Sequence, residues 1–291
     1  MQIYKLENDE LKIQVNSTGA ELDSIYNKKY QLEYMWNGDP AFWPKKSPVL
    51  FPIVGTLKND EYYFQNRSFK MGRHGFAREK EFEVTEQSPE KIKFSLQSNG
   101  ETLKQYPFGF LFDIIYTITG NFLQVTYQVT NTGNDVMYFS VGGHPAFMLP
   151  LEAATVYEDY FLEFSEFENA GRWPISKDGL IEDAPVPLLV NTNILPLNKQ
   201  LFQQDALVFK DLRSDKVSLR SIKTPRGINF IFKGFPYLGI WAAKNADFVC
   251  IEPWCGIADS VHSDQQLIHK EGINRLDPGN LFKRTWSVEV C

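Results

Sequence analysis

The sequence predicts an all-β fold, a sandwich or a barrel, in one large domain over residues 1–291. Short segments alternate apolar and polar residues, as half-buried strands do. Turn signals recur at a spacing of roughly 8–12 residues, and no segment carries a long helical period. The 23 Phe and 13 Tyr also favour strands. Because no composition break marks a linker and no repeat is present, we expect a single domain.

The N-terminal part reads as a hairpin followed by an aromatic loop. Residues 11–15 and 20–26 flank the turn signal Asn16-Ser17-Thr18-Gly19. Closely spaced prolines exclude a helix from the Trp-rich residues 36–58, which are predicted to end in a short buried strand at 49–54. This loop either walls a ligand pocket or caps one end of the core.

The clearest hairpin joins residues 110–119 to residues 122–130 through Gly120-Asn121, a pair favoured in tight turns. Helical turns are expected at 101–106 and 197–202. The remaining predicted strands are 61–64, 68–71, 91–97, 136–141, 160–164, 207–209, 217–222, 228–232, 238–242 and 281–290.

The stretch Phe248–Gly256 places a carboxylate, that of Glu252, after a run of apolar residues. Pro253 is predicted to end this strand, because proline is confined to strand ends, edges and bulges. A Glu at a strand mouth against an apolar wall has a raised pKa, which suits a general base near neutral pH. The alternative is a Glu that is merely solvated at a strand end.

A second strand leads to a titratable side chain in the same way. Residues 136–141 run into Gly142-Gly143-His144-Pro145, and we expect the two glycines to leave room for a substrate beside His144. The alternative is a core histidine that is hydrogen-bonded to the backbone.

Two further segments carry candidate binding residues. The segment Gly72–Arg78 is basic in an acidic chain and contains Arg73, His74 and Arg78. Its histidine is either part of a site or simply exposed between two arginines. Asp205 precedes an apolar strand, and the alternative role for it is that of a turn or capping residue.

Charge and cysteine content limit the possible partners. A formal net charge of −6 argues against nucleic acid or an anionic membrane as a partner. The chain shows neither a secretory signal nor an apolar run of membrane-spanning length. Three cysteines without a metal-ligand spacing fit a reducing cytoplasm. We therefore expect a cytoplasmic monomer or homodimer that acts on a small molecule.

The motifs of several enzyme classes are absent. The sequence contains no H-E-x-x-H, no C-x-x-C, no G-x-S-x-G and no phosphate-binding glycine loop. It therefore predicts no metal and no cofactor. Acid–base chemistry by histidine and carboxylate side chains remains.

The segments Gly72–Arg78, Val141–Phe147, Asp205, Cys250–Trp254 and Leu276–Gly279 follow one another in this order. In this combination the chain closely resembles the aldose 1-epimerase (galactose mutarotase) superfamily and, within it, the LacX-like branch. The resemblance extends over nearly the whole chain. It implies a large galactose-mutarotase-like β-sandwich, or supersandwich. The implied activity is cofactor-free interconversion of the α and β anomers of an aldohexose or hexose phosphate.

The resemblance also implies roles for individual residues. Glu252 would take the proton of the anomeric hydroxyl while His144 protonates the ring oxygen, the two acting from opposite sides of the hemiacetal. His74 and Asp205 would bind sugar hydroxyls, and Arg78 would bind sugar or a phosphate.

One position departs from the family pattern. Classical galactose mutarotases carry an arginine soon after a glycine where this chain has Gly55-Thr56. A sugar-binding arginine is therefore missing there or is supplied by Arg73 or Arg78. Since two arginines beside a pocket can bind a phosphate, free and phosphorylated hexoses both remain possible substrates.

Two other functions compete with a mutarotase. One is a carbohydrate-binding protein of the same fold without useful catalysis, although a binder needs neither an acid nor a base. The other is a glycoside hydrolase or lyase that uses Glu252 and Asp205, whose carboxyls would then lie about 5–9.5 Å apart across a cleft.

Overall fold

The computed structural model describes residues 2–291 and confirms the all-β prediction. One short helix, α1 (Thr102–Gln105), lies where a helical turn was expected, and 3₁₀ turns span Lys58–Asp60, Ala77–Glu79, Tyr157–Asp159, Lys199–Phe202 and Leu267–His269. The strands are β1 Ile3–Glu7, β2 Leu11–Asn16, β3 Glu21–Asn27, β4 Leu32–Glu33, β5 Val49–Leu50, β6 Glu61–Phe64, β7 Arg67–Lys70, β8 Glu83–Ser88, β9 Lys91–Gln97, β10 Phe110–Thr119, β11 Phe122–Asn131, β12 Met137–Phe139, β13 Val141–Gly143, β14 Ala146–Met148, β15 Tyr160–Arg172, β16 Val186–Pro196, β17 Leu207–Lys210, β18 Lys216–Ser221, β19 Ile228–Ile231, β20 Tyr237–Trp241, β21 Phe248–Cys255, β22 Asn274–Leu276 and β23 Leu281–Val290.

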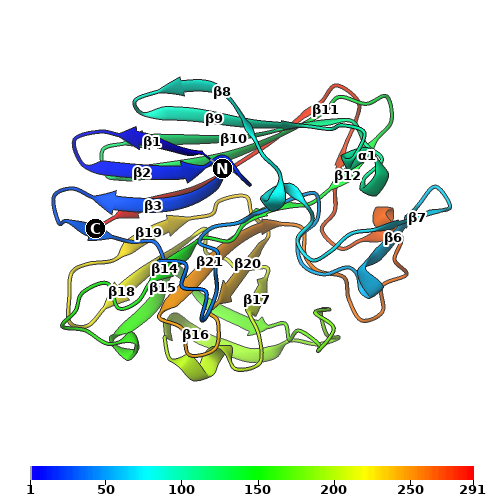
Figure 1. Ribbon diagram of the computed structural model, residues 1–291. Coiled ribbons are helices and arrows are strands. Elements are labelled where there is room, and N and C mark those ends of the chain that lie inside the picture. The colour runs from blue at the N-terminus through cyan, green and yellow to red at the C-terminus, as the bar shows by residue number, and fades with distance from the viewer. Residues whose placement is uncertain (1) are drawn as a thin grey trace.

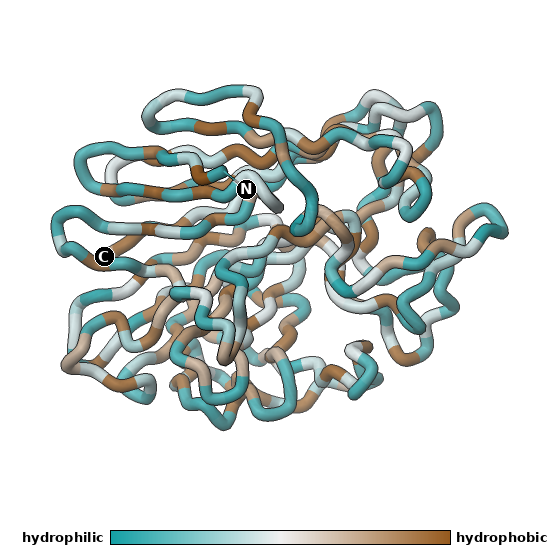
Figure 2. Tube along the Cα trace, in the orientation of Figure 1, coloured by the Kyte–Doolittle hydropathy of each residue, from teal (hydrophilic) through white to brown (hydrophobic). Residues whose placement is uncertain are grey.

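The largest sheet has nine antiparallel strands in the order β16-β15-β18-β19-β23-β11-β10-β9-β8 (Figure 1). It contains the predicted hairpin of β10 and β11, in which Phe112 pairs with Val129 and Ile114 with Tyr127. All four of these side chains are buried, because alternate residues of a strand point to the same face. Figure 2 shows this alternation as teal and brown segments along the strands.

A six-stranded sheet, which holds the site described below, packs against the large one. Its order is β17-β20-β21-β13-β5, and β14 also pairs with β21. All eight residues of β21 are buried. Phe147 of β14 meets Phe230 of β19 edge to face, with ring centroids 6.1 Å apart. These contacts join the two sheets into a sandwich whose core contains many aromatic side chains.

Smaller sheets complete the structure. Strands β1 to β4 form a four-stranded sheet, which is tied to the large sheet by the Tyr116 hydroxyl donating to the Ala20 carbonyl at 2.7 Å. The β6–β7 hairpin projects at the right of Figure 1, and β12 pairs with β22.

Two strand predictions differ from the structure. The expected strand 136–141 is divided into β12 and β13, which belong to different sheets. The region 150–206, in which only 160–164 was expected as a strand, contains the long strands β15 and β16. Their pairing contains three register shifts, and these bulges obscure the two-residue alternation in the sequence.

The prediction that Pro253 ends its strand is wrong. Strand β21 continues through Pro253 to Cys255. Its neighbour on one side is interrupted at this point, because β13 pairs with residues 254–255 and β14 with residues 248–250. Pro253 lies opposite the interruption, where its missing N–H leaves no ladder hydrogen bond unmade.

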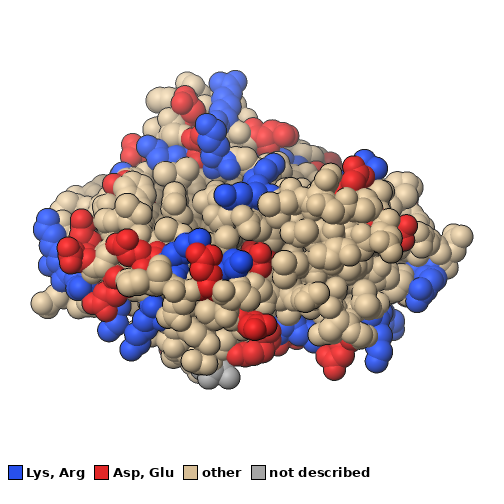
Figure 3. Space-filling view, turned by 90° about the horizontal axis from the view of Figure 1, so that it is seen from above, with Lys and Arg blue, Asp and Glu red and all other residues tan. Residues whose placement is uncertain are grey.

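Two further features concern the surface charge and the helices. Basic and acidic side chains are intermixed on the face seen in Figure 3 rather than separated by sign. Within residues 2–291, no helix has the length and apolar character needed to cross a membrane.

Candidate active site

The six residues singled out from the sequence lie around one cavity of about 470 Å³. They come from four separate parts of the chain. They are Arg73, His74, Arg78, His144, Asp205 and Glu252. Three tryptophans, at positions 43, 241 and 254, form aromatic walls of the same cavity. The structure therefore brings all the predicted site residues together, although their roles stay predictions.

The interruption between β13 and β14 places His144 beside Glu252. His144 occupies the gap between the two short strands, and Glu252 lies opposite this gap in β21. The Nε2 atom of His144 is 3.2 Å from Oε2 of Glu252. The expectation that the two groups approach a hemiacetal from opposite sides stays a prediction.

The two glycines before His144 serve packing rather than a substrate. A Cβ at Gly142 would lie 2.8 Å from Cδ1 of Trp254, and one at Gly143 would lie 2.6 Å from the Tyr127 hydroxyl. The Tyr127 hydroxyl also accepts the indole N–H of Trp286 at 2.9 Å. The missing side chain of Gly143 thus lets the large sheet approach closely, and that of Gly142 leaves room for Trp254 of the neighbouring strand β21.

Burial shifts the pKa values of Glu252 and His144 in opposite directions. Burial raises the pKa of Glu252 well above its usual value, helped by the Asp205 charge and opposed by Arg73 and by the facing Trp254 indole. Burial also lowers the pKa of His144 to about 3, and Arg73 and Arg78 act in the same direction. Both shifts favour a protonated Glu252 beside a neutral His144.

Unsatisfied polar atoms converge on this pair. Among the described residues, five buried side-chain atoms have no hydrogen-bond partner, and three of them are His144 Nδ1, Glu252 Oε2 and Trp254 Nε1. Buried polar groups in folded proteins are nearly always hydrogen-bonded. We therefore interpret this cluster as a set of donors and acceptors arranged for a polar ligand.

His74 is buried beside the cavity, which rules out the alternative of an exposed histidine. Its Nδ1 accepts the backbone N–H of Gly55 at 3.1 Å, and the Nε–H of Arg73 points to its Nε2 at 3.3 Å. Burial, Arg73 and the neighbouring His144 lower its pKa well below the usual value. These contacts hold the ring in place at the wall of the cavity.

Charged side chains lie at the rim of the cavity. Nη2 of Arg73 is 3.8 Å from Oδ1 of Asp205, and both side chains are partly exposed. Nη2 of Arg78 donates to the Arg73 carbonyl at 2.9 Å, which fixes the loop. Asp205 Oδ1 also accepts the N–H of Ala206 at 2.7 Å, so Asp205 makes a local turn contact and lines the cavity as well.

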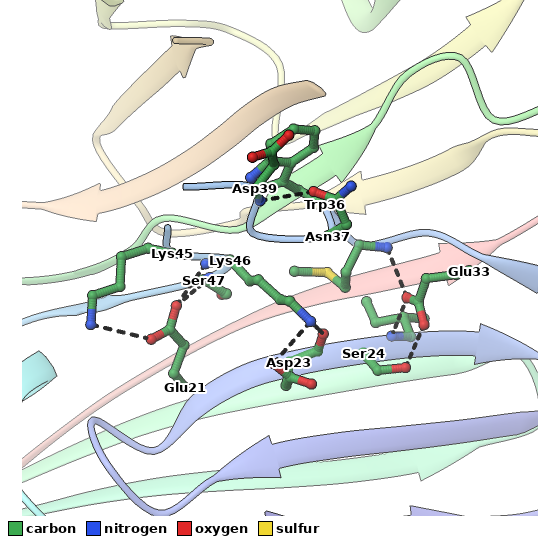
Figure 4. Close-up of polar contacts among 12 residues, drawn as sticks. Glu21, Asp23, Ser24, Glu33, Trp36, Asn37, Asp39, Lys45, Lys46 and Ser47 are labelled. Atoms are coloured by element: carbon green, nitrogen blue, oxygen red, sulfur yellow. Dashed lines mark hydrogen bonds and ion pairs between the residues drawn. The ribbon is translucent and has the colours of Figure 1, made fainter. Parts of the chain in front are cut away.

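The aromatic loop of residues 36–47 serves both roles that the sequence left open. Trp36 is buried in the core, and its indole donates to the Trp43 carbonyl at 2.9 Å. Trp43 lines the cavity, where its ring lies 4.9 Å from that of His144, centroid to centroid. Figure 4 shows how the loop is tied to β3: Glu21 accepts the N–H groups of residues 46 and 47.

Several lining residues were not predicted from the sequence. Residues 175–181 form a flap closed by pairing of Ile175 with Ile181, and both side chains line the cavity. At its tip, a Cβ on Gly179 would lie 2.6 Å from Oγ1 of Thr56. The position where an arginine was missing is thus packed against the flap. Trp241 and the pair Gln203-Gln204 also line the cavity. In the sequence, only the position of the two glutamines next to Asp205 indicates that they line the site.

Comparisons with known proteins place the chain in a family. A sequence model of the aldose 1-epimerase family matches residues 2–270. The chain is 36% identical to the chromosomal LacX protein of Lactococcus lactis subsp. lactis, with 98% of each chain covered.

Solved structures show the same architecture. A galactose mutarotase related enzyme from Lactobacillus acidophilus is 38% identical, and the match covers 100% of this chain and 97% of the other with a TM-score of 0.95. A galactose mutarotase-like protein from Lactobacillus casei is 32% identical over 100% of both chains with a TM-score of 0.91. The fold is therefore a galactose-mutarotase-like β-sandwich, as the resemblance implied.

Proposed function

The chain belongs to the aldose 1-epimerase family and to its LacX-like branch, and from this premise we propose that it is a mutarotase. In this proposal it interconverts the α and β anomers of an aldohexose or a hexose phosphate by opening and closing the sugar ring. Residues 1–291 act as a single domain in the cytoplasm, as a monomer or homodimer, with a small-molecule sugar as the partner.

The observation that carries the proposal is the contact between Glu252 and His144. The pair faces the cavity, its two polar atoms are 3.2 Å apart, and the pKa shifts favour a protonated Glu252 beside a neutral His144. Ring opening requires one proton to leave the anomeric oxygen and one to reach the ring oxygen. Both oxygens are bonded to the same carbon, so a pair on one side of the sugar can serve both.

The proton balance closes over one cycle. One member of the pair takes the proton of the anomeric hydroxyl as the bond from the anomeric carbon to the ring oxygen breaks, and the other member protonates the ring oxygen. Rotation about the bond between carbons 1 and 2 presents the other face of the aldehyde. Ring closure then returns both protons. General acid and general base catalysis each contribute about 10²–10⁴-fold.

The remaining cavity residues suit a sugar. The imidazole of His74 and the carboxylate of Asp205 can bind hydroxyls, and Arg73 lies beside both. Indole rings cover the apolar faces of a hexose well. A phosphate would need Arg73 and Arg78 together, so the substrates to compare are free hexoses and their 6-phosphates.

The test is NMR exchange between α and β anomer signals for glucose, galactose and their 6-phosphates. We expect faster exchange for at least one sugar, and a loss of at least about 10²-fold in Glu252→Gln with the fold retained. The matched control is Glu158→Gln, which changes an exposed carboxylate in the same way.

Each competing function predicts a different result. Sugar binding without accelerated exchange would indicate a carbohydrate-binding protein instead. A glycosidase would release sugar from a glycoside with Glu252 and Asp205 as its carboxylate pair. The partnership of Glu252 with His144 rather than with a second carboxylate argues against it.

A further inference from the structure

Cys250 is a buried thiol directly behind the proposed acid–base pair. It lies two residues before Glu252 in β21, so both side chains point to the same face of the sheet. It is a free cysteine with no exposed surface, and it pairs in the sheets with Ala146 and Trp241. Proton transfer to a sugar requires no thiol at this position.

The thiol, the imidazole and the carboxylate converge. One ring nitrogen of His144, the sulfur of Cys250 and a carboxylate oxygen of Glu252 all lie within 4.8 Å of one another. All three residues are buried, and Oε2 of Glu252 and Nδ1 of His144 have no hydrogen-bond partner. No other such trio occurs among residues 2–291.

We propose that His144, Cys250 and Glu252 bind Zn²⁺ or a similar borderline-soft divalent cation, and that the bound ion blocks mutarotation. Imidazole, thiolate and carboxylate are the ligands that zinc prefers, whereas Ca²⁺ and Mg²⁺ prefer oxygen ligands alone. Three protein ligands leave a fourth position, which faces the cavity. The inhibition, but not the binding, rests on the proposed function.

Charge and size both fit a divalent ion. A thiolate and a carboxylate neutralise a charge of +2, which minimises the cost of burying the complex. Binding releases the thiol and carboxyl protons to solvent, one for each anionic ligand. Ligand atoms around tetrahedral zinc are about 3.3–3.8 Å apart for bonds of about 2.0–2.3 Å. Since the three ligand atoms lie within 4.8 Å of one another, the trio needs a contraction of at most about 1–1.5 Å, which side-chain rotation can supply.

The ion inhibits because it takes the atoms that catalysis uses. A metal bound to the imidazole nitrogen and the carboxylate oxygen leaves the pair without its proton and without a free acceptor. Ring opening then has neither an acid nor a base. The ion would enter through the cavity, which Glu252 and His144 line.

The test measures binding and inhibition separately. Metal-free protein is titrated with Co²⁺ while the near-ultraviolet cobalt–thiolate absorption is followed, and with Zn²⁺ while anomer exchange is followed by NMR. The test variant is Cys250→Ala, with Cys250→Ser in its place if the alanine variant does not fold. The matched control is Cys255→Ala, which removes the other buried thiol of β21.

We expect the thiolate absorption in the native protein and in the Cys255 variant, but not in the Cys250 variant. Zn²⁺ should inhibit the native protein reversibly, with activity restored by EDTA. Half-inhibition of the Cys250 variant, measured against the variant's own rate without metal, should need at least about tenfold more Zn²⁺ than half-inhibition of the native protein. Even changes outside the ligand shell weaken metal sites 10–100-fold.

Absence of the cobalt band from the native protein would overturn the site. A cobalt band with unchanged exchange at saturating Zn²⁺ would overturn the inhibition. If the native protein shows the cobalt band while its metal-free form accelerates no anomer exchange, that result would support the site and refute the proposed function.

Discussion

Trp254 is held between two glycines, and an alanine at one of them should impair catalysis without touching a substrate. A Cβ at Gly239 in β20 would lie 2.5 Å from Cζ2 and 2.6 Å from Cη2 of the Trp254 ring. On the other side, a Cβ at Gly142 would meet the same side chain at 2.8 Å. The φ angle of Gly239 lies outside the left-handed region, so the effect of Gly239→Ala is steric.

The size of the effect follows from these distances. Ordinary contacts of a Cβ fall between 3.4 and 4 Å, so the rigid indole must move by about 1 Å. The indole N–H faces Glu252 and lowers its pKa, so the shift removes a fixed dipole from the acid–base pair. A misplacement of about 1 Å can cost roughly 10²-fold in rate. Overpacking should also lower the free energy of unfolding by about 1–3 kcal/mol.

The assay is the turnover number for anomer exchange, measured by NMR together with a thermal unfolding curve. Gly100→Ala is the matched control, because a Cβ there meets no atom within 4 Å. Trp254→Phe separates the contribution of the indole N–H from that of the packed ring, since it removes the N–H and keeps an aromatic ring. If Gly239→Ala folds and retains a turnover number within a few-fold of the native protein, Trp254 does not position the acid–base pair.

Three further predictions concern pH, stability and affinity. In the presence of a chelator, kcat/KM should stay level as the pH is lowered through 6.5 and should fall only near pH 3, because His144 gains a proton there while Glu252 keeps its own. A fall of kcat/KM near pH 6.5, the pKa of an exposed histidine, would contradict this prediction. Lys270→Met leaves the buried Asp259 without its partner at 2.7 Å, and urea denaturation should show a loss of about 3–5 kcal/mol. In Trp43→Ala, the factor by which KM rises should be about ten times the factor by which kcat falls, because the ring walls the cavity. A fall in kcat alone would assign Trp43 to the chemical step.

The sequence predicts the fold well where the strand period is undisturbed. Residues 91–97, 110–119 and 281–290 were expected as strands with the bounds that the structure has. Alternation fails as a guide where the chain changes sheets or bulges. The run 136–141 looks like one strand because all its residues but Ser140 are apolar, yet β12 and β13 pair with different partners.

The site could be predicted as a set of residues but not as a geometry. His144 and Glu252 each stand next to a proline in the sequence, and from this each was expected at a strand end. In the structure a single interruption of the ladder, where β13 gives way to β14, accommodates Pro253 and brings the two groups together at 3.2 Å.

The same geometry explains why the thiol gave no signal in the sequence. Cys250 and Glu252 have no metal-ligand spacing, and His144 is more than one hundred residues away along the chain. Only the pairing of β14 with β21 places them in one cluster. A pair buried deeply enough for Glu252 to keep its proton offers the same two atoms to any cation that can displace that proton. The burial that favours the proposed acid–base chemistry therefore also creates the proposed metal site.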